Sequence, residues 1–410
     1  MHERMPDPRK PHNEEKFAEA DFYRDRFKRW ADRENQSLLV RSGLREPVTE
    51  SYAAQIAAER EARDLLRRVS EEYEKWNKSF VRVRDHLLFQ RDQPGQEREP
   101  DTLALFMGGA QYGAYCAGQI IGLNLAGITP ELFKAVGGSS AGSGPPAYWV
   151  AGEEQTLIAA SLFENECTSK EFLNPRRVHK MIDTSVPARA MRHGPKALDE
   201  AAVRAASPEV FAIARDQRTH KTEYIDLKTV KTDIVTALEA SSAISPFREG
   251  VEIDGKVLED GGFNEIDLEE IIKIYKPKKI LLFPNVPFDF IDTLKYNKTE
   301  RALIKGASYL SELDSINSIG TLESFLKEKG KLRNLLEKIE QMHGVDIGVM
   351  WPPDSGVKTL TTDRDIITSA VIESARDVID RFGGKQPHEI PSFEGSANAH
   401  RNSRPEEMVA

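Results

Sequence analysis

Residues 136–142 read Val-Gly-Gly-Ser-Ser-Ala-Gly, and their first residue is the last of the short apolar run at 132–136. Gly138 and Gly142 stand two residues before and two residues after Ser140, which gives the pattern G-x-S-x-G. In proteins that use this pattern, a nucleophilic serine lies on a strained turn between a strand and a helix, and small flanking residues permit close backbone approach. A glycine-rich turn with a capping serine would read the same way. The stretch therefore predicts a strand that ends at a turn, and other residues must decide its chemistry.

The region around this stretch alternates short apolar runs with helical segments. Strand candidates are 102–107, the run into Ser140, 224–227, 279–283 and 347–351, with helical segments such as 267–275 and 363–382 between them. Such alternation favours an α/β fold with three layers, α/β/α, and a mainly parallel central sheet. In that architecture, sites form at the carboxyl ends of the strands, where Gly108 and Ser140 both lie.

A second glycine-rich turn, Phe106–Gly113, joins the first predicted strand to the next helix. Free backbone N–H groups at a helix start can bind a phosphate or the oxyanion of an acyl-transfer intermediate. A dinucleotide site needs G-x-G-x-x-G and a P-loop needs Gly-Lys followed by Ser or Thr. Ala110 occupies the position of the second glycine, and no such lysine follows. The turn is therefore interpreted as an oxyanion site.

The third element is Asp260-Gly261-Gly262, about 120 residues after Ser140. On its own this triplet indicates only a turn. It follows the segment Ala240–Phe247, which reads A-S-S-A-I-S-P-F. A glycine-rich turn, a G-x-S-x-G serine and an aspartate in this order resemble the patatin-like phospholipase family. The resemblance runs from about Thr102 to Val286 and continues more loosely to Phe382.

The resemblance implies a patatin-like serine acyl hydrolase, a phospholipase A or other lipid acyl hydrolase, that cleaves carboxylic esters through an acyl-enzyme intermediate and needs no cofactor or metal. Ser140 would attack the ester carbonyl, and Asp260 would accept its proton and later activate water. A carboxylate base must not be too acidic, so we expect Asp260 to be partly desolvated. The backbone N–H groups of the oxyanion site would be those of Gly108, Gly109 and Ala110. The supporting motif glycines are Gly113, Gly138, Gly142, Gly261 and Gly262.

The chain departs from the family pattern in several places. The family's turn is usually G-G-G-x-R/K-G, whereas this chain has Ala110 for the third glycine and Tyr112 for the basic residue. Alanine keeps its N–H group, so the oxyanion site can survive if φ at Ala110 is negative. Pro145 and Pro146 follow the serine where a helix should begin, and proline is tolerated only in the first turn. These departures bear on substrate and rate more than on the class of reaction.

Two alternatives stay open. An α/β-hydrolase esterase would use the order serine, acid, histidine, with His343 or His388 completing a triad with Ser140. Both histidines lie in charged or tail-like segments that indicate solvated positions. The other alternative is a scaffold or regulatory protein that keeps the fold after its catalysis has decayed, while its N-terminal region binds a partner.

The composition restricts partners and location. The 410 residues carry a formal net charge of −9, which argues against nucleic acid as the main partner. Cys116 and Cys167 give neither a metal-ligand spacing nor a disulfide framework, which fits a reducing compartment. The sequence shows no signal peptide and no apolar run of the roughly 18 residues that a membrane span needs. We therefore expect a cytoplasmic or peripheral-membrane protein that meets a lipid or phospholipid at a membrane or micelle surface, although a protein exported without a classical signal would read the same.

Three regions of the chain differ in composition. Residues 1–100 form a charged region rich in helix formers, and apolar side chains three and four apart from 66 to 87 mark one face of a helix. We expect that face to pack on the main domain, with a protein partner or self-association through residues 50–90 as the alternative. Residues 101–382 form the predicted patatin-like domain, and 383–410, rich in Gly, Pro, Ser and Asn, a disordered tail.

Overall fold

The computed structural model describes residues 71–92, 99–174, 182–244, 248–264, 266–288, 331–342 and 344–383. The chain divides into two compact units, Met1–Tyr73 and Glu74–Ala410, and the fold given below is that of the described part of the second unit. The predicted helical region up to residue 70 and the predicted tail from residue 384 lie outside the described residues.

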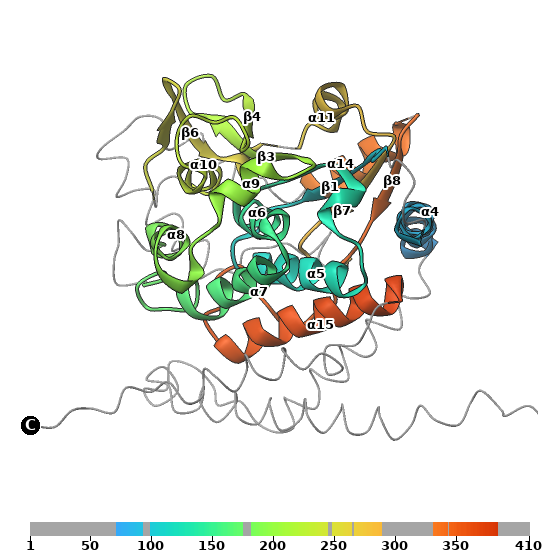
Figure 1. The fold of residues 1–410 in the computed structure, drawn as a ribbon, viewed down its shortest axis with the longest axis horizontal. Coiled ribbons are helices and arrows are strands. Elements are labelled where there is room, and N and C mark those ends of the chain that lie inside the picture. The colour runs from blue at the N-terminus through green and yellow to red at the C-terminus, as the bar shows by residue number, and fades with distance from the viewer. Residues whose placement is uncertain are drawn as a thin grey trace, which may run out of the picture. The chain divides into compact units, whose positions relative to one another are not determined.

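The strands of the described residues form one eight-stranded sheet in the order β5-β6-β3-β2-β1-β7-β8, with β4 paired to β3 (Figure 1). Their bounds are β1 Thr102–Phe106, β2 Phe133–Ser139, β3 Glu209–Asp216, β4 Thr222–Asp226, β5 Val251–Ile253, β6 Lys256–Asp260, β7 Lys279–Phe283 and β8 Asp346–Val349. The run β3-β2-β1-β7-β8 is parallel. The pairs β3-β4, β3-β6 and β5-β6 are antiparallel. The predicted mainly parallel central sheet is therefore confirmed.

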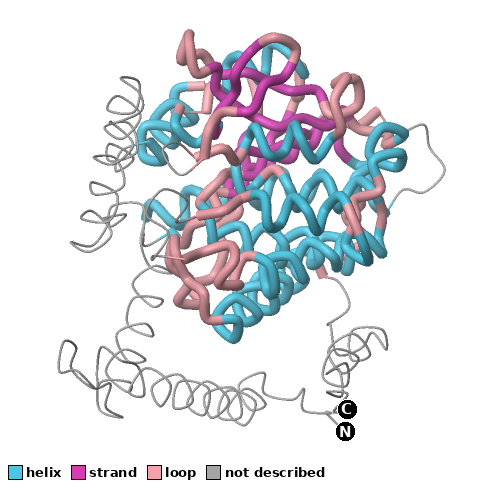
Figure 2. The backbone as a smooth tube through the Cα atoms, turned by 90° about the vertical axis from the view of Figure 1, so that its left-hand side faces the viewer, coloured by secondary structure: helices cyan, strands magenta, loops and turns pink. Residues whose placement is uncertain are grey.

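Helices lie on both sides of this sheet, as the flanking helices in Figure 2 show. They are α4 Glu71–Asp92, α5 Gly113–Leu125, α6 Gly144–Ala151, α7 Glu153–Ser161, α8 Ser185–Arg192, α9 Glu200–Ala205, α10 Ile234–Ser241, α11 Leu268–Tyr275, α14 Lys331–Gln341 and α15 Arg364–Phe382. Every residue of β1 is buried, which is typical of a parallel strand covered on both faces. The architecture is the predicted α/β/α arrangement.

Helices α5 and α15 pack closely because α5 presents glycines to its neighbour. A Cβ atom at Gly118 would lie 2.2 Å from the Val371 carbonyl oxygen, and one at Gly122 would lie 2.6 Å from that of Ala375. Larger residues at either position would force the two helices apart. This packing fixes α5, and with it the glycine-rich turn that precedes it.

The apolar face of α4 is buried from Trp76 to Leu87. The ring of Phe80 meets that of Phe382 edge to face, with centroids 5.7 Å apart. Nη1 of Arg91 donates to the backbone oxygen of Ala126 at 2.8 Å. The described part of this helix thus packs on the main domain. Among the described residues, no helix has both the length and the apolar character needed to cross a bilayer.

Candidate active site

Ser140 is the first residue after β2 and begins a short 3-10 turn, Ser140–Gly142, that leads into α6. Its φ is 51°, in the left-handed region that costs a non-glycine residue roughly 1–2 kcal/mol. Such strain persists only where the surroundings enforce it, and it clusters at functional sites. The predicted strand that ends in a strained turn at Ser140 is therefore present.

The glycines of the elbow are required by close backbone contacts. A Cβ atom at Gly138 would lie 2.1 Å from the carbonyl oxygen of Gly142, and one at Gly142 would lie 2.2 Å from that of Met107. Pro145 and Pro146 fall in the first turn of α6, where proline is tolerated, so the helix begins at Gly144, soon after the turn Ser140–Gly142.

The backbone of the serine is held by a second buried serine. The N–H of Ser140 donates to Oγ of Ser241 at 2.9 Å, and that hydroxyl donates to the carbonyl oxygen of Ile213 at 2.6 Å. Ser241 is the last residue of α10 and is fully buried. The segment A-S-S-A-I-S-P-F was recognised in the sequence, but this role of its first serine was missed.

Ser140 and Asp260 are joined by a direct hydrogen bond. Oγ of Ser140 donates to Oδ2 of Asp260 at 2.6 Å, with no histidine between them. The two side chains come from the ends of β2 and β6, 120 positions apart in the chain. Asp260 is 4% exposed, in line with the expected desolvation of a carboxylate base. His343 and His388, the triad candidates, lie outside the described residues.

The carboxylate of Asp260 is held in place by its own turn. Its Oδ1 accepts a hydrogen bond from the N–H of Gly262 at 2.7 Å, which leaves Oδ2 toward Ser140. A Cβ atom at Gly261 would lie 2.2 Å from the carbonyl oxygen of Ile213, so the turn packs directly on β3. Both glycines of the D-G-G motif therefore help to orient the Asp260 carboxylate, Gly262 through its N–H and Gly261 through its close packing on β3.

A buried ion pair fixes the end of β6 beside Asp260. Glu259 lies opposite Arg215 in the antiparallel β3-β6 ladder. Its Oε1 accepts from Nη2 of Arg215 at 2.5 Å and from Nε at 2.7 Å. Removing one partner of such a buried pair would leave an uncompensated charge, so the pair keeps this strand end in one arrangement.

The glycine-rich turn follows β1 and lies against the serine elbow. A Cβ atom at Gly108 would lie 2.7 Å from Cβ of Ser140, so only glycine permits this approach. The N–H of Gly108 donates to Oγ of Ser139 at 3.0 Å. In the described part of the chain, the N–H groups of Gly109 and Ala110 donate to no protein acceptor. They are therefore available to a ligand at the start of the short helix Ala110–Tyr112.

The conformation of Ala110 corrects one expectation. Its φ is 52°, so the condition of a negative φ, on which survival of the oxyanion site was made to depend, is not met. The turn keeps the left-handed backbone that glycine adopts readily, and the alanine is forced into it. Ala110 keeps its N–H group in this conformation, but it does so at a cost in stability.

Replacing Ala110 by glycine should therefore raise the free energy of unfolding by about 1 kcal/mol, because it removes the left-handed strain. Urea denaturation monitored by circular dichroism measures the change. The matched control is Ala201→Gly on the exposed face of α9, which should lower stability because glycine is a poor helix former. Equal losses in both variants would contradict the strain at Ala110.

Asn285, which follows β7, also holds the glycine-rich turn. Its Nδ2 donates to the carbonyl oxygen of Met107, and the N–H of Met107 donates to the carbonyl oxygen of Phe283 at 2.9 Å. Asn285 is fully buried with a φ of 58°, a conformation that asparagine tolerates better than most residues. Its place just beyond a parallel strand, next to the glycine-rich turn, gives no signal in the sequence that would mark this role.

A largely apolar pocket of about 930 Å³, its open mouth included, has Ser140 in its wall. Its apolar lining includes Phe163, Phe172, Met191, Leu238, Ile244 and Leu360. Phe163 belongs to a π-helical segment, Leu162–Glu166, and a Cβ atom at Gly113 would lie 2.4 Å from its ring. Gly113 thus makes room for one wall of the pocket.

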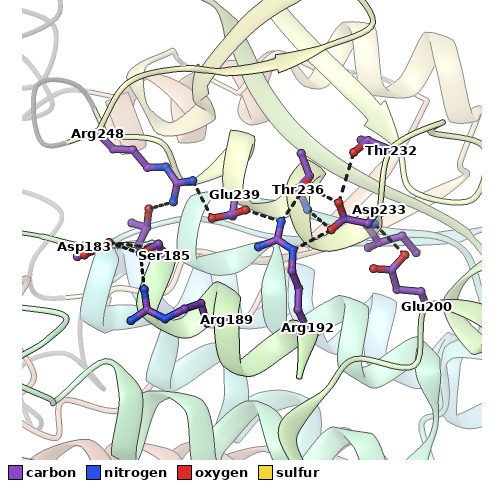
Figure 3. Close-up of polar contacts among 12 residues, drawn as sticks. Asp183, Ser185, Arg189, Arg192, Glu200, Thr232, Asp233, Thr236, Glu239 and Arg248 are labelled. Carbon is purple, nitrogen blue, oxygen red and sulfur yellow. Dashed lines mark hydrogen bonds and ion pairs between the residues drawn. The ribbon is translucent and has the colours of Figure 1, made fainter. Parts of the chain in front are cut away.

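Among the described residues of this wall, Glu239 is the one with a charged side chain, and two arginines pair with it (Figure 3). Oε2 of Glu239 accepts from Nη2 of Arg192 at 2.6 Å, and Oε1 accepts from Nη2 of Arg248 at 2.7 Å. Arg192 comes from α8 and Glu239 from α10, and both helices line the pocket. Because a carboxylate against apolar surface is costly unless it is paired, the arginines hold this wall together.

Neither described cysteine is a reactive nucleophile. Burial raises the pKa of the Cys116 thiol well above its ordinary value. Burial likewise raises the pKa of Cys167, which lies in the pocket wall, to about 12. Both therefore stay protonated at neutral pH, and a neutral thiol is a poor nucleophile. Ser140, whose hydroxyl donates to the buried carboxylate of Asp260, is the candidate nucleophile in the pocket.

No family model matches the chain, and no curated protein does. Among solved structures, VipD from Legionella pneumophila is similar, with a TM-score of 0.36 and 14% sequence identity, covering 69% of this chain and 67% of that one. So low a score supports no inference about chemistry. The fold and the site by themselves define an α/β protein with a buried serine–carboxylate pair at the carboxyl end of a parallel sheet.

Proposed function

We propose that the protein is a serine acyl hydrolase that cleaves carboxylic esters of lipids, as a phospholipase A or a related lipid acyl hydrolase. The observation that carries the proposal is the 2.6 Å hydrogen bond from Ser140 to Asp260 on a strained elbow. A nucleophile needs a base within hydrogen-bond reach, and here the base is a carboxylate whose second oxygen is already fixed. The resemblance of the three motifs to the patatin-like family supports the same assignment.

In the proposed reaction, Oγ of Ser140 attacks the ester carbonyl carbon while its proton passes to Oδ2 of Asp260. The tetrahedral intermediate collapses, the bond to the leaving oxygen breaks, and Asp260 returns the proton to the departing alcohol. A water molecule then gives its proton to Asp260 and attacks the acyl-enzyme, and the second collapse releases the fatty acid and returns the proton to Ser140. No other co-reactant is needed.

The oxyanion that forms twice in this cycle needs hydrogen-bond donors close to Ser140. The glycine-rich turn meets the elbow at Gly108 and offers backbone N–H groups at the start of a helix. Removal of one such donor in other enzymes costs about 3 kcal/mol of transition-state stabilisation. Because the glycine-rich turn contacts the serine elbow, its backbone N–H groups can serve as the oxyanion donors, and no side-chain donor is required.

The pocket next to Ser140 supports a lipid as the substrate. Its described lining is mainly aliphatic and aromatic, and its one carboxylate is neutralised by two arginines. Such a surface favours the hydrocarbon of an acyl chain over a polar substituent. We therefore place the acyl chain in the pocket and the leaving alcohol toward its mouth, where the protein would meet a membrane or micelle.

The value of kcat/KM should rise with acyl-chain length. Each buried methylene contributes about 0.8 kcal/mol, or roughly fourfold in kcat/KM, until the pocket is filled. A series of p-nitrophenyl esters from acetate to palmitate, assayed below their critical micelle concentrations, measures this dependence. A flat or falling profile from the shortest ester onward would exclude the pocket as an acyl site.

The function itself is tested by incubating the full-length protein with phospholipid, diacylglycerol and monoacylglycerol and measuring released fatty acid by mass spectrometry. Release from at least one lipid, at a rate that saturates with substrate, is expected. A folded protein that releases no fatty acid from any of them, and none from the p-nitrophenyl esters, would instead fit the scaffold alternative.

A further inference from the structure

We infer that Ser139, the neighbour of the proposed nucleophile, is a positioning residue whose hydroxyl fixes the glycine-rich turn that forms the proposed oxyanion site. The inference rests on the proposed function. In the sequence, Ser139 fills the variable position of G-x-S-x-G, so nothing in the pattern assigns it a role. The structure gives it one, because its Oγ lies 3.0 Å from the backbone nitrogen of Gly108 and accepts that N–H.

This hydrogen bond continues the β1-β2 pairing by one step beyond the strands. The paired residues of the parallel ladder end at Phe106 and Gly138. Gly108 comes two residues after the end of β1, and Ser139 is the last residue of β2. The Ser139 side chain supplies the acceptor for the Gly108 N–H and is only 3% exposed. The Gly108 N–H is partly buried, so leaving it unpaired would carry a desolvation penalty.

The same bond determines which N–H groups face the reaction. Ala110 and Ser140 line the pocket, whereas Gly108, Gly109 and Ser139 are absent from its described lining. The Gly108 N–H therefore points along the sheet toward β2 and away from substrate. With Gly108 held in this way, the chain turns at Gly109, whose φ is 149°, and brings Ala110 into the pocket wall beside Ser140.

The turn is also fixed on its other side. The Met107 N–H donates to the carbonyl oxygen of Phe283 at 2.9 Å, and the Met107 carbonyl oxygen accepts from Nδ2 of Asn285. These bonds tie Met107 to β7, while the bond to Ser139 ties Gly108 to β2. Two successive peptides are thus anchored to the two strands that flank β1, which defines the direction of the next N–H groups. Loss of the Ser139 hydroxyl would release one of these anchors beside the oxyanion.

The test compares Ser139→Ala with wild type in steady-state hydrolysis of a p-nitrophenyl ester. We expect kcat to fall about tenfold or more while KM changes less than about twofold, because oxyanion donors act on the transition state. Inhibition by an alkylboronic acid, which forms a tetrahedral anion on Ser140, should weaken by a similar factor. Ser139→Thr, which keeps a hydroxyl and suits a strand end, should restore both values. The matched control, Ser374→Ala, removes a fully buried hydroxyl in α15 and should change neither.

The other outcomes overturn the inference. An unchanged kcat in Ser139→Ala would show that the hydroxyl has no part in catalysis. A raised kcat would show that Ser139 occupies a donor that the oxyanion needs. If Ser139→Ala fails to fold, Ser139→Cys, with its weaker acceptor, must show the loss of kcat that Ser139→Thr does not, and equal rates in these two variants would reject the role. Absence of any hydrolysis by wild type is a separate result, which rejects the proposed function itself.

Discussion

Ser140→Ala should lower ester hydrolysis by at least about 10³-fold, because removal of the nucleophile leaves only binding and the oxyanion site to accelerate the reaction. The loss should appear in kcat, since the pocket that binds the acyl chain is intact. Relief of the left-handed strain at this position is small, because alanine also disfavours a φ of 51°. The variant should therefore fold with a Tm close to that of wild type.

The measurement is the initial rate of release of p-nitrophenol from the best ester of the chain-length series, with circular dichroism to confirm folding. Ser374→Ala serves as the control, since it removes another buried serine hydroxyl far along the chain in α15. An activity of Ser140→Ala within tenfold of wild type would show that a different residue attacks the ester.

Asp260→Asn should lower kcat by about 10⁴-fold, the loss seen when a catalytic aspartate is made neutral without a change of shape. Asparagine retains an oxygen that can accept from the Gly262 N–H, so the turn should stay formed. Its amide cannot take a proton from Ser140, so the 2.6 Å contact would remain without a base. The large loss at nearly constant structure is what distinguishes a base from a structural carboxylate.

The matched control for this variant is Asp216→Asn, another buried aspartate near the end of its strand. Its Oδ1 accepts from the N–H groups of Thr219 and Arg218, and the first of these bonds is the main cause that lowers its pKa. Asp216→Asn should cost stability and leave the rate nearly unchanged. Full activity in Asp260→Asn, together with loss on replacing His343 or His388, would favour a serine–histidine triad instead.

The fold class could be predicted because its signals are local. The apolar runs before Gly108 and Ser140 are buried parallel strands, and a glycine-rich turn follows each of them. The order of the strands along the sheet could not be predicted, since alternating strands and helices are compatible with several orders. The pairing of β6 antiparallel to β3 brings Asp260 to Ser140, and only the structure shows that pairing.

The residues that the sequence analysis missed act through contacts between distant segments. Ser139, Ser241 and Asn285 each hydrogen-bond to backbone more than 30 positions away, and serine and asparagine are too common in turns to signal this. The positive φ at Ala110 could not be predicted from the sequence, because alanine normally avoids the left-handed region. The surrounding turn, fixed at Met107 and Gly108, overrides that local preference.

The most direct test of the central claim is active-site labelling with a fluorophosphonate, which phosphonylates only a serine that a base has activated. Intact-mass spectrometry of the full-length protein should show one adduct per chain, and peptide mapping should place it on Ser140. Labelling should be absent in Ser140→Ala and strongly slowed in Asp260→Asn. A folded wild-type protein that takes up no label, or an adduct that persists in Ser140→Ala, would contradict the Ser140–Asp260 assignment.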